Sequence, residues 1–167
     1  MVQRAGEVGP LTGSSGEGVR VLAVDLGLRR IGLAVSDPLG LTAQGLPSLA
    51  RGSDPVGQVL RVCREVGATE VVVGLPLRMD GSFGPAAESA RDFGERLRVR
   101  SGLAVHLWDE RLSSVAAERT LIEGGVRRLD RRRRGLVDRG AAVLILQGFL
   151  DRRRSEAGGG RTSGPPP

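Results

Sequence analysis

The chain has 167 residues with 40% hydrophobic side chains, which suits a single globular domain with a core of its own. One cysteine and one histidine exclude a disulfide framework, a multi-cysteine zinc site and a histidine-rich metal centre. The net charge is +6 and all 25 basic residues are arginines, which favours a partner that carries phosphate, although a GC-rich genome would enrich arginine in the same way.

Both ends of the chain have low sequence complexity. Residues 1–18 and 154–167 are rich in small and polar residues, and we expect them to be disordered tails around one domain at 19–153. The first tail lacks the apolar stretch of a secretion signal, and the chain has no run of about 18 apolar residues that could span a membrane. We therefore expect the protein to be cytoplasmic.

Between the tails, apolar runs and capping signals predict strands and helices in a definite order. Five strands are expected, the first two as a hairpin, at residues 19–25, 31–37, 41–50, 70–75 and 103–108. Four helices are expected, at residues 54–67, 85–101, 113–125 and 136–153. An arginine-rich loop at 126–135 precedes the last of them.

This order predicts an α/β fold with a five-stranded mixed sheet and helices on both faces. Three strands follow one another directly, and right-handed crossovers then make the first, fourth and fifth strands parallel. Open α/β sheets bind ligands at the carboxyl ends of such strands. Three segments are expected at that edge, namely Asp25, the loop at 76–84 and the pair Asp109-Glu110.

Asp25 ends a strand that is otherwise built for burial. A carboxylate removed from water costs several kcal/mol unless it is paired or bound to a metal. A second acid, Asp138, falls on the apolar stripe of the last helix, and the loop at 126–135 is long enough to bring it back to Asp25. The alternative role for Asp138 is a favourable interaction with the helix dipole.

The other acids near this edge are less easily assigned. Asp109 and Glu110 point in different directions, so one is expected in the site and the other beside Arg29, Arg30 or Arg111; the alternation of a strand does not decide which. Asp37 is excluded, because the hairpin register places it roughly 17 Å from Asp25.

Three clustered carboxylates need a cationic partner, and Mg²⁺ (or Mn²⁺) suits oxygen ligands. Two such ions can clamp the attacking and leaving oxygens of a displacement at phosphorus. Acids beside an arginine run therefore predict hydrolysis of a phosphodiester. Contacts to the nucleic-acid backbone are expected from Arg29, Arg30, Arg78, Arg111, Arg131, Arg132, Arg133 and Arg134, although the run at 131–134 also fits a solvated loop.

Four segments, in this order, closely resemble the YqgF/RuvX family: DLGLRRIGLAVSD, VVVGLPLRMDGS, DERLSS and VDRGAAVLILQGFLD. The resemblance covers residues 19–151 and implies an RNase H-like fold. It also implies metal-binding acids at Asp25, at Glu110 within DER and at Asp138 within VDRGAA, with Asp109 as the substitute for Glu110. The basic stretch RRRRGL before Asp138 departs from the family pattern.

Members of that family are known as pre-16S rRNA nucleases and as Holliday junction resolvases. The resemblance therefore implies a nuclease that processes the 5′ end of precursor 16S rRNA in ribosome biogenesis, with cleavage of four-way DNA as the alternative. A non-catalytic nucleic-acid-binding assembly factor and an ATP-binding relative of actin and the sugar kinases are further alternatives. Either a monomer or a homodimer is compatible with the sequence, and His106 is expected to be a packed strand residue.

Overall fold

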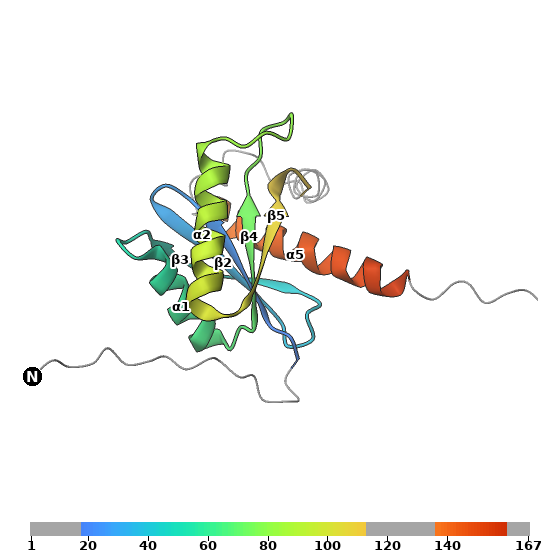
Figure 1. The fold of residues 1–167 in the computed structure, drawn as a ribbon. Coiled ribbons are helices and arrows are strands. Elements are labelled where there is room, and N and C mark those ends of the chain that lie inside the picture. Colours follow the sequence, from blue (N-terminus) through green and yellow to red (C-terminus); the bar gives the residue numbers. More distant parts are fainter. Residues whose placement is uncertain (1–17, 113–135, 160–167) are drawn as a thin grey trace, which may run out of the picture.

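The computed structural model describes residues 18–112 and 136–159, with side chains in the second range described from residue 140 (Figure 1). The strands are β1 (Val21–Leu26), β2 (Arg30–Ser36), β3 (Ala43–Ala50), β4 (Glu70–Leu75) and β5 (Ala104–Asp109). The helices are α1 (Pro55–Val66), α2 (Pro85–Ser101) and α5 (Leu136–Gly158), and residues 110–112 are also helical.

The five strands form one sheet in the order β3-β2-β1-β4-β5. β1 pairs antiparallel with β2 and parallel with β4, and β4 pairs parallel with β5. The predicted mixed sheet is confirmed, together with the parallel arrangement of its first, fourth and fifth strands. Their carboxyl ends lie along one edge of the molecule (Figure 1).

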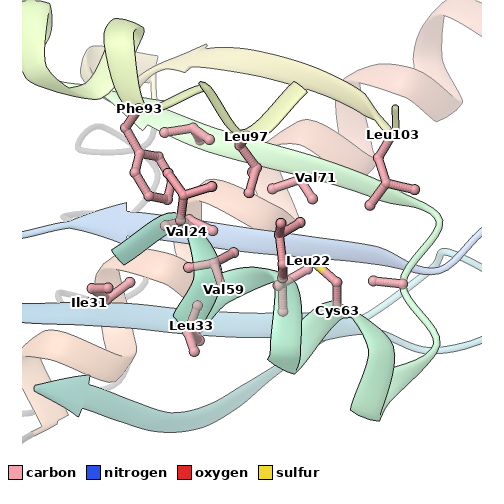
Figure 2. Close-up of a cluster of buried hydrophobic side chains, with 14 of the residues drawn as sticks. Leu22, Val24, Ile31, Leu33, Val59, Cys63, Val71, Phe93, Leu97 and Leu103 are labelled. Carbon is pink, nitrogen blue, oxygen red and sulfur yellow. The ribbon is translucent and has the colours of Figure 1, made fainter. Parts of the chain in front are cut away.

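Helices cover both faces of the sheet, as the sequence predicts. α1 and α2 pack on one face over large side chains such as Leu22, Ile31 and Leu33 (Figure 2). α5 packs on the opposite face through Ala142, Ile145, Leu146 and Leu150, all of them buried. On that face the central strands present the small side chains of Ala23 and Ala34, so α5 can approach the sheet closely.

Local capping explains where the first helix begins and ends. The Asp54 carboxylate accepts a hydrogen bond of 3.0 Å from the Gly57 N–H, and Pro55 occupies the first turn. Gly67 ends the helix with a left-handed backbone (φ 66°), which only glycine adopts without a steric penalty. Both boundaries agree with the prediction.

Three strands of the sheet begin later than predicted, the first of them β1, which begins at Val21 rather than residue 19. β3 begins at Ala43 rather than residue 41, because the Asp37 carboxylate accepts hydrogen bonds from the N–H groups of Leu41 (2.6 Å) and Thr42 (2.8 Å) and holds the chain in a turn. The last strand is shifted by one residue, to 104–109.

α5 continues five residues beyond the predicted end at Arg153, so residues 154–158 are helical rather than part of a disordered tail. Side-chain ion pairs one turn apart support this extension, with 2.9 Å between Arg152 and Glu156 and a further pair between Arg154 and Asp151.

Several predictions fall outside the described residues. They are the tail residues 1–17 and 160–167, the helix at 113–125 and the loop at 126–135 with its four consecutive arginines. Within the part of the chain that the structure describes, no helix is both long enough and apolar enough to cross a membrane.

Candidate active site

Asp25 is held at the sheet edge by the β1–β2 hairpin. Its Cα pairs with that of Gly32, as the hairpin register predicts, and the turn beyond it is closed by a 2.9 Å hydrogen bond from the Gly27 N–H to the Arg30 carbonyl. Val21 and Ala23 of the same strand lie in the core beneath α5. Because strand residues alternate between faces, Asp25 belongs to the face that α5 covers.

The carboxylate of Glu110 reaches Asp25 from the far side of β4. Glu110 follows β5 directly and is the first of the helical residues 110–112. Its side chain occupies space above Gly74 of β4 and is hydrogen-bonded to the side chain of Asp25. Two carboxyl groups can share a hydrogen bond only when one of them is protonated, so this contact favours the protonated form of the pair.

The environment of Glu110 opposes its ionisation. Burial is the largest cause, followed by the negative charge of Asp25, the hydrogen bond to Asp25 and the charge of Asp109. Together they raise the pKa of Glu110 to about 7, from the ordinary value of 4.5. A bound cation would stabilise the ionised form of such a carboxyl group and would take the place of the proton.

Asp109 is engaged elsewhere. The guanidinium of Arg111 donates to both of its carboxylate oxygens, at 2.7 Å from Nη2 to Oδ2 and 3.0 Å from Nε to Oδ1. The backbone N–H of Arg111 donates to Oδ1 as well. These hydrogen bonds, with the charge of Arg111, lower the pKa of Asp109 despite its partial burial. Of the two adjacent acids, Glu110 therefore contacts Asp25, and Asp109 is the one that pairs with an arginine.

The direction of α5 brings its first turn toward the same edge. Arg153, late in the helix, is hydrogen-bonded to Glu70, the first residue of β4. Ile145 lies above Gly74, next to the last residue of that strand. The helix read backwards therefore runs toward the carboxyl end of β4, and Asp138 lies about two turns, or roughly 10 Å, beyond Ile145 along the axis.

Three arginines lie in the described segments next to Asp25 and in the loop that follows β4. A hollow of about 330 Å³ is lined by Asp25 and by other residues of the β1–β2 hairpin, namely Gly27, Leu28, Arg29, Arg30 and Gly32. Arg30 donates to the Ser48 hydroxyl of β3 at 2.7 Å, and Arg78 lies in the exposed loop that follows β4. The four arginines at 131–134 lie outside the described residues.

A family model described as "RuvX: Holliday junction resolvase" matches residues 19–152, which is most of the chain. The chain belongs to the RuvX family. A relative from Pelotomaculum thermopropionicum, named "Putative pre-16S rRNA nuclease", is 48% identical over 153 residues and is matched over 98% of its length and 88% of this chain. A relative of the same name from Myxococcus xanthus is 51% identical over 138 residues, with 90% of its length and 81% of this chain covered.

A solved structure supports the RNase H-like fold of this RuvX-family chain. It is the Thermus thermophilus RuvC in complex with a Holliday junction substrate, which superimposes with a TM-score of 0.55. The match is 17% identical in sequence and covers 82% of this chain and 96% of the other.

The described acids of the RuvX-family chain suit a divalent cation but do not complete a site. Among the side chains that the structure describes, no group of three acids, histidines or cysteines is arranged to hold a metal. Asp25 and Glu110 bring carboxylate oxygens into contact with each other, and such oxygens are ligands that suit a hard cation such as Mg²⁺. The third expected ligand, Asp138, belongs to the first turn of α5, whose side chains are outside the description.

Asp37 and His106, which were not predicted from the sequence to belong to the site, lie away from Asp25 and Glu110. Asp37 closes the β2–β3 turn at the opposite end of the hairpin, as predicted. His106 packs its ring 5.0 Å from that of Phe149, and its Nε2 lies 2.9 Å from the Glu70 carboxylate. The prediction of a packed strand residue is confirmed.

Three residues that support the site were not predicted from the sequence. Arg51 donates to the Gly27 carbonyl at 3.0 Å and braces the turn behind Asp25. Gly74 and Ile145 together shape the space that holds the Glu110 carboxylate. A single glycine that interrupts the apolar run of β4 was the one signal available, since isolated glycines in strands mark close approach of another group.

Proposed function

We propose that this RuvX-family protein is a divalent-metal-dependent nuclease that hydrolyses phosphodiester bonds in the 5′ processing of precursor 16S rRNA. The observation that carries the proposal is the side-chain contact between Asp25 and Glu110 at the carboxyl edge of the sheet. Relatives 48% and 51% identical, matched over 98% and 90% of their length, carry the name "Putative pre-16S rRNA nuclease". The close match in length supports transfer of the activity to the whole domain.

Three carboxylates would hold the cation. Asp25 and Glu110 supply oxygen ligands from the ends of two parallel strands, and Asp138 supplies a third from the first turn of α5. Mg²⁺ or Mn²⁺, as one ion or two, provides positive charge for the attacking and leaving oxygens of the scissile phosphate. Asp109 keeps Arg111 in place rather than binding metal, because both of its oxygens already accept from that guanidinium.

The arginines would bind the nucleic-acid backbone. Arg29 and Arg30 border the hollow beside Asp25, and Arg78 extends from the loop after β4. Arg111 connects the end of β5 to the loop after β4, because it pairs with Asp109 and its Nη1 also donates to the Met79 carbonyl at 3.3 Å. Contacts of this kind position a substrate by its phosphates and do not read its sequence. The arginines at 131–134, close in sequence to Asp138, are expected to contribute to backbone binding as well.

The family description favours a second substrate, a four-way DNA junction. The same acids and arginines would serve it, since the chemistry at phosphorus is unchanged. Junction cleavage requires two cuts placed symmetrically, so this alternative also requires a homodimer, whereas trimming of a single RNA strand requires only a monomer.

A paired cleavage assay tests the proposal. Precursor 16S rRNA and a four-way DNA junction are each incubated with the protein in Mg²⁺ and, separately, in excess chelator. We expect Mg²⁺-dependent cleavage of the rRNA at its 5′ end, abolished by Asp25→Asn. The matched control is Asp37→Asn, the same substitution in the same hairpin at its other end, which should cleave as the unmodified protein does.

The other results are equally informative. Cleavage of the junction alone would assign the protein to DNA. Tight binding of rRNA with no cleavage of either substrate, unaffected by Mg²⁺, would instead make it an assembly factor. Full activity in Asp25→Asn would remove that residue from the site and with it the metal mechanism.

A further inference from the structure

Gly74 lies where β4, Glu110 and α5 meet. It is buried, and a Cβ atom built on it would lie 2.4 Å from Glu110 Oε1 and 2.6 Å from the Cδ1 atom of Ile145. Real Cβ atoms essentially never approach other heavy atoms within 3.0 Å. Any side chain at position 74 would therefore displace the carboxylate, the helix side chain or both.

The backbone does not itself require glycine at this position. The glycines with positive φ angles among the described residues are Gly40, Gly67, Gly81 and Gly102, and Gly74 is not one of them. Glycine in the interior of a strand weakens that strand, because it has the most conformational freedom to lose on folding. The remaining explanation for Gly74 is the space that its missing side chain leaves.

That space has two occupants from distant parts of the chain. The Glu110 carboxylate fills one side and lies against Asp25, and Ile145 of α5, itself 1% exposed, fills the other. Both contacting atoms are the far ends of flexible side chains. A methyl group at position 74 is therefore expected to move them without unfolding the sheet.

We propose that Gly74 is a positioning residue for the metal site, which leaves room for the Glu110 carboxylate to lie beside Asp25 while α5 closes over it. This inference rests on the proposed function, because it assumes that the two carboxylates bind a cation together. It predicts that position 74 acts on the site through the placement of Glu110, separately from its effect on the packing of α5.

Four variants separate these two effects. Gly74→Ala introduces both close contacts, and Ile145→Val removes the Cδ1 atom that one of them involves. The double variant G74A/I145V therefore relieves the contact with α5 and keeps the contact with Glu110. Gly94→Ala is the matched control, because its Cβ would lie 3.1 Å from a Leu107 methyl in the α2–β5 packing, on the other face of the sheet.

The readouts are the thermal midpoint and the affinity for Mn²⁺, measured directly on the protein without nucleic acid. We expect Gly74→Ala to lower the thermal midpoint and to weaken Mn²⁺ binding at least tenfold. The double variant should recover much of the midpoint and little of the affinity. Gly94→Ala should bind Mn²⁺ within twofold of the unmodified protein, and Ile145→Val alone supplies the reference against which the double variant is compared.

Two contrary outcomes have different meanings. If affinity returns together with the midpoint in G74A/I145V, or never falls, Gly74 only packs the helix and the positioning role is overturned. If the unmodified protein binds no Mn²⁺, the proposed function fails first and the role of Gly74 falls with it.

Discussion

At the scale of single residues, the carboxyl group of Glu110 is strongly affected by the fold. Burial and the adjacent Asp25 raise its pKa to about 7, so the folded protein retains a proton that the unfolded chain releases near pH 4.5. Between these two values the folded state binds more protons than the unfolded state, and its stability falls as the pH rises. Above pH 7 this loss is complete.

Glu110→Gln removes this titration and should stabilise the metal-free protein at neutral pH. The gain over the unmodified protein should be absent at pH 4, grow between pH 4.5 and 7, and reach about 3 kcal/mol above pH 7, since one pKa unit corresponds to about 1.4 kcal/mol. Urea unfolding of both proteins across this pH range, in chelator, measures the difference. A difference that does not vary with pH would mean that Glu110 ionises normally in the fold.

The two adjacent acids should differ in their effect on cleavage. We expect Glu110→Gln to abolish Mg²⁺-dependent cleavage, because it removes one of the three proposed metal ligands. Asp109→Asn should lower it less than tenfold, because it weakens only the hold on Arg111. Rates under saturating Mg²⁺ decide between them, and the reverse ranking would place the metal on Asp109.

The position of Asp25 was predictable, because a hairpin register follows from local turn geometry. The choice between Asp109 and Glu110 did not follow from the strand pattern, and only the resemblance to the family indicated Glu110. That choice depends on which face of the sheet α5 covers, and that is decided by packing between residues more than 70 positions apart, such as Gly74 and Ile145. The small residues that let α5 approach the sheet, Ala23, Ala34 and Gly74, are isolated positions in the sequence and form no pattern there.

At the scale of elements, α5 forms one wall of the site and is anchored far from it. Arg153 is hydrogen-bonded to Glu70 and lies 4.9 Å over the ring of Phe149. The Glu70 carboxylate, 18% exposed, also contacts His106. Burial works against its ionisation, but the hydrogen bonds and charges of Arg153 and His106 outweigh it and lower the pKa of Glu70.

Arg153→Ala should therefore destabilise the protein by about 1–2 kcal/mol, because it removes a partner of a largely buried carboxylate and a cation–π interaction. Its neighbour Arg152 pairs with Glu156 in solvent, at 2.9 Å with both side chains more than 60% exposed. Arg152→Ala is the control and should change stability by less than about 0.5 kcal/mol. Equal free energies of unfolding for the two variants would show that the Glu70 cluster does not anchor α5.

Most elements could be predicted with their boundaries, because glycine, proline and capping residues mark them locally. The carboxyl end of α5 could not. Residues 154–158 are polar and would read as a tail, and they are helical through side-chain pairs that are recognised only once the helix is assumed.

At the scale of the whole molecule, the net charge of +6 should make nucleic-acid binding depend on salt. Replacing Arg131, Arg132, Arg133 and Arg134 with alanine should reduce the slope of log affinity against log salt by about 0.7–0.9 for each phosphate that the protein no longer neutralises. The control replaces four arginines of the helices on the other face, Arg61, Arg64, Arg96 and Arg98, so that the net charge is the same. Similar slopes for the two variants would mean that the run at 131–134 contributes only general charge.

Direct measurement of Mn²⁺ binding by electron paramagnetic resonance tests most closely whether Asp25, Glu110 and Asp138 hold a divalent cation together. The unmodified protein should bind Mn²⁺ at neutral pH, and Asp25→Asn, Glu110→Gln and Asp138→Asn should each weaken binding at least tenfold, while Asp109→Asn and Asp37→Asn leave it within threefold. Undiminished Mn²⁺ binding in Asp25→Asn or Glu110→Gln would contradict this assignment, since the paired carboxylates would then not be ligands of the metal ion.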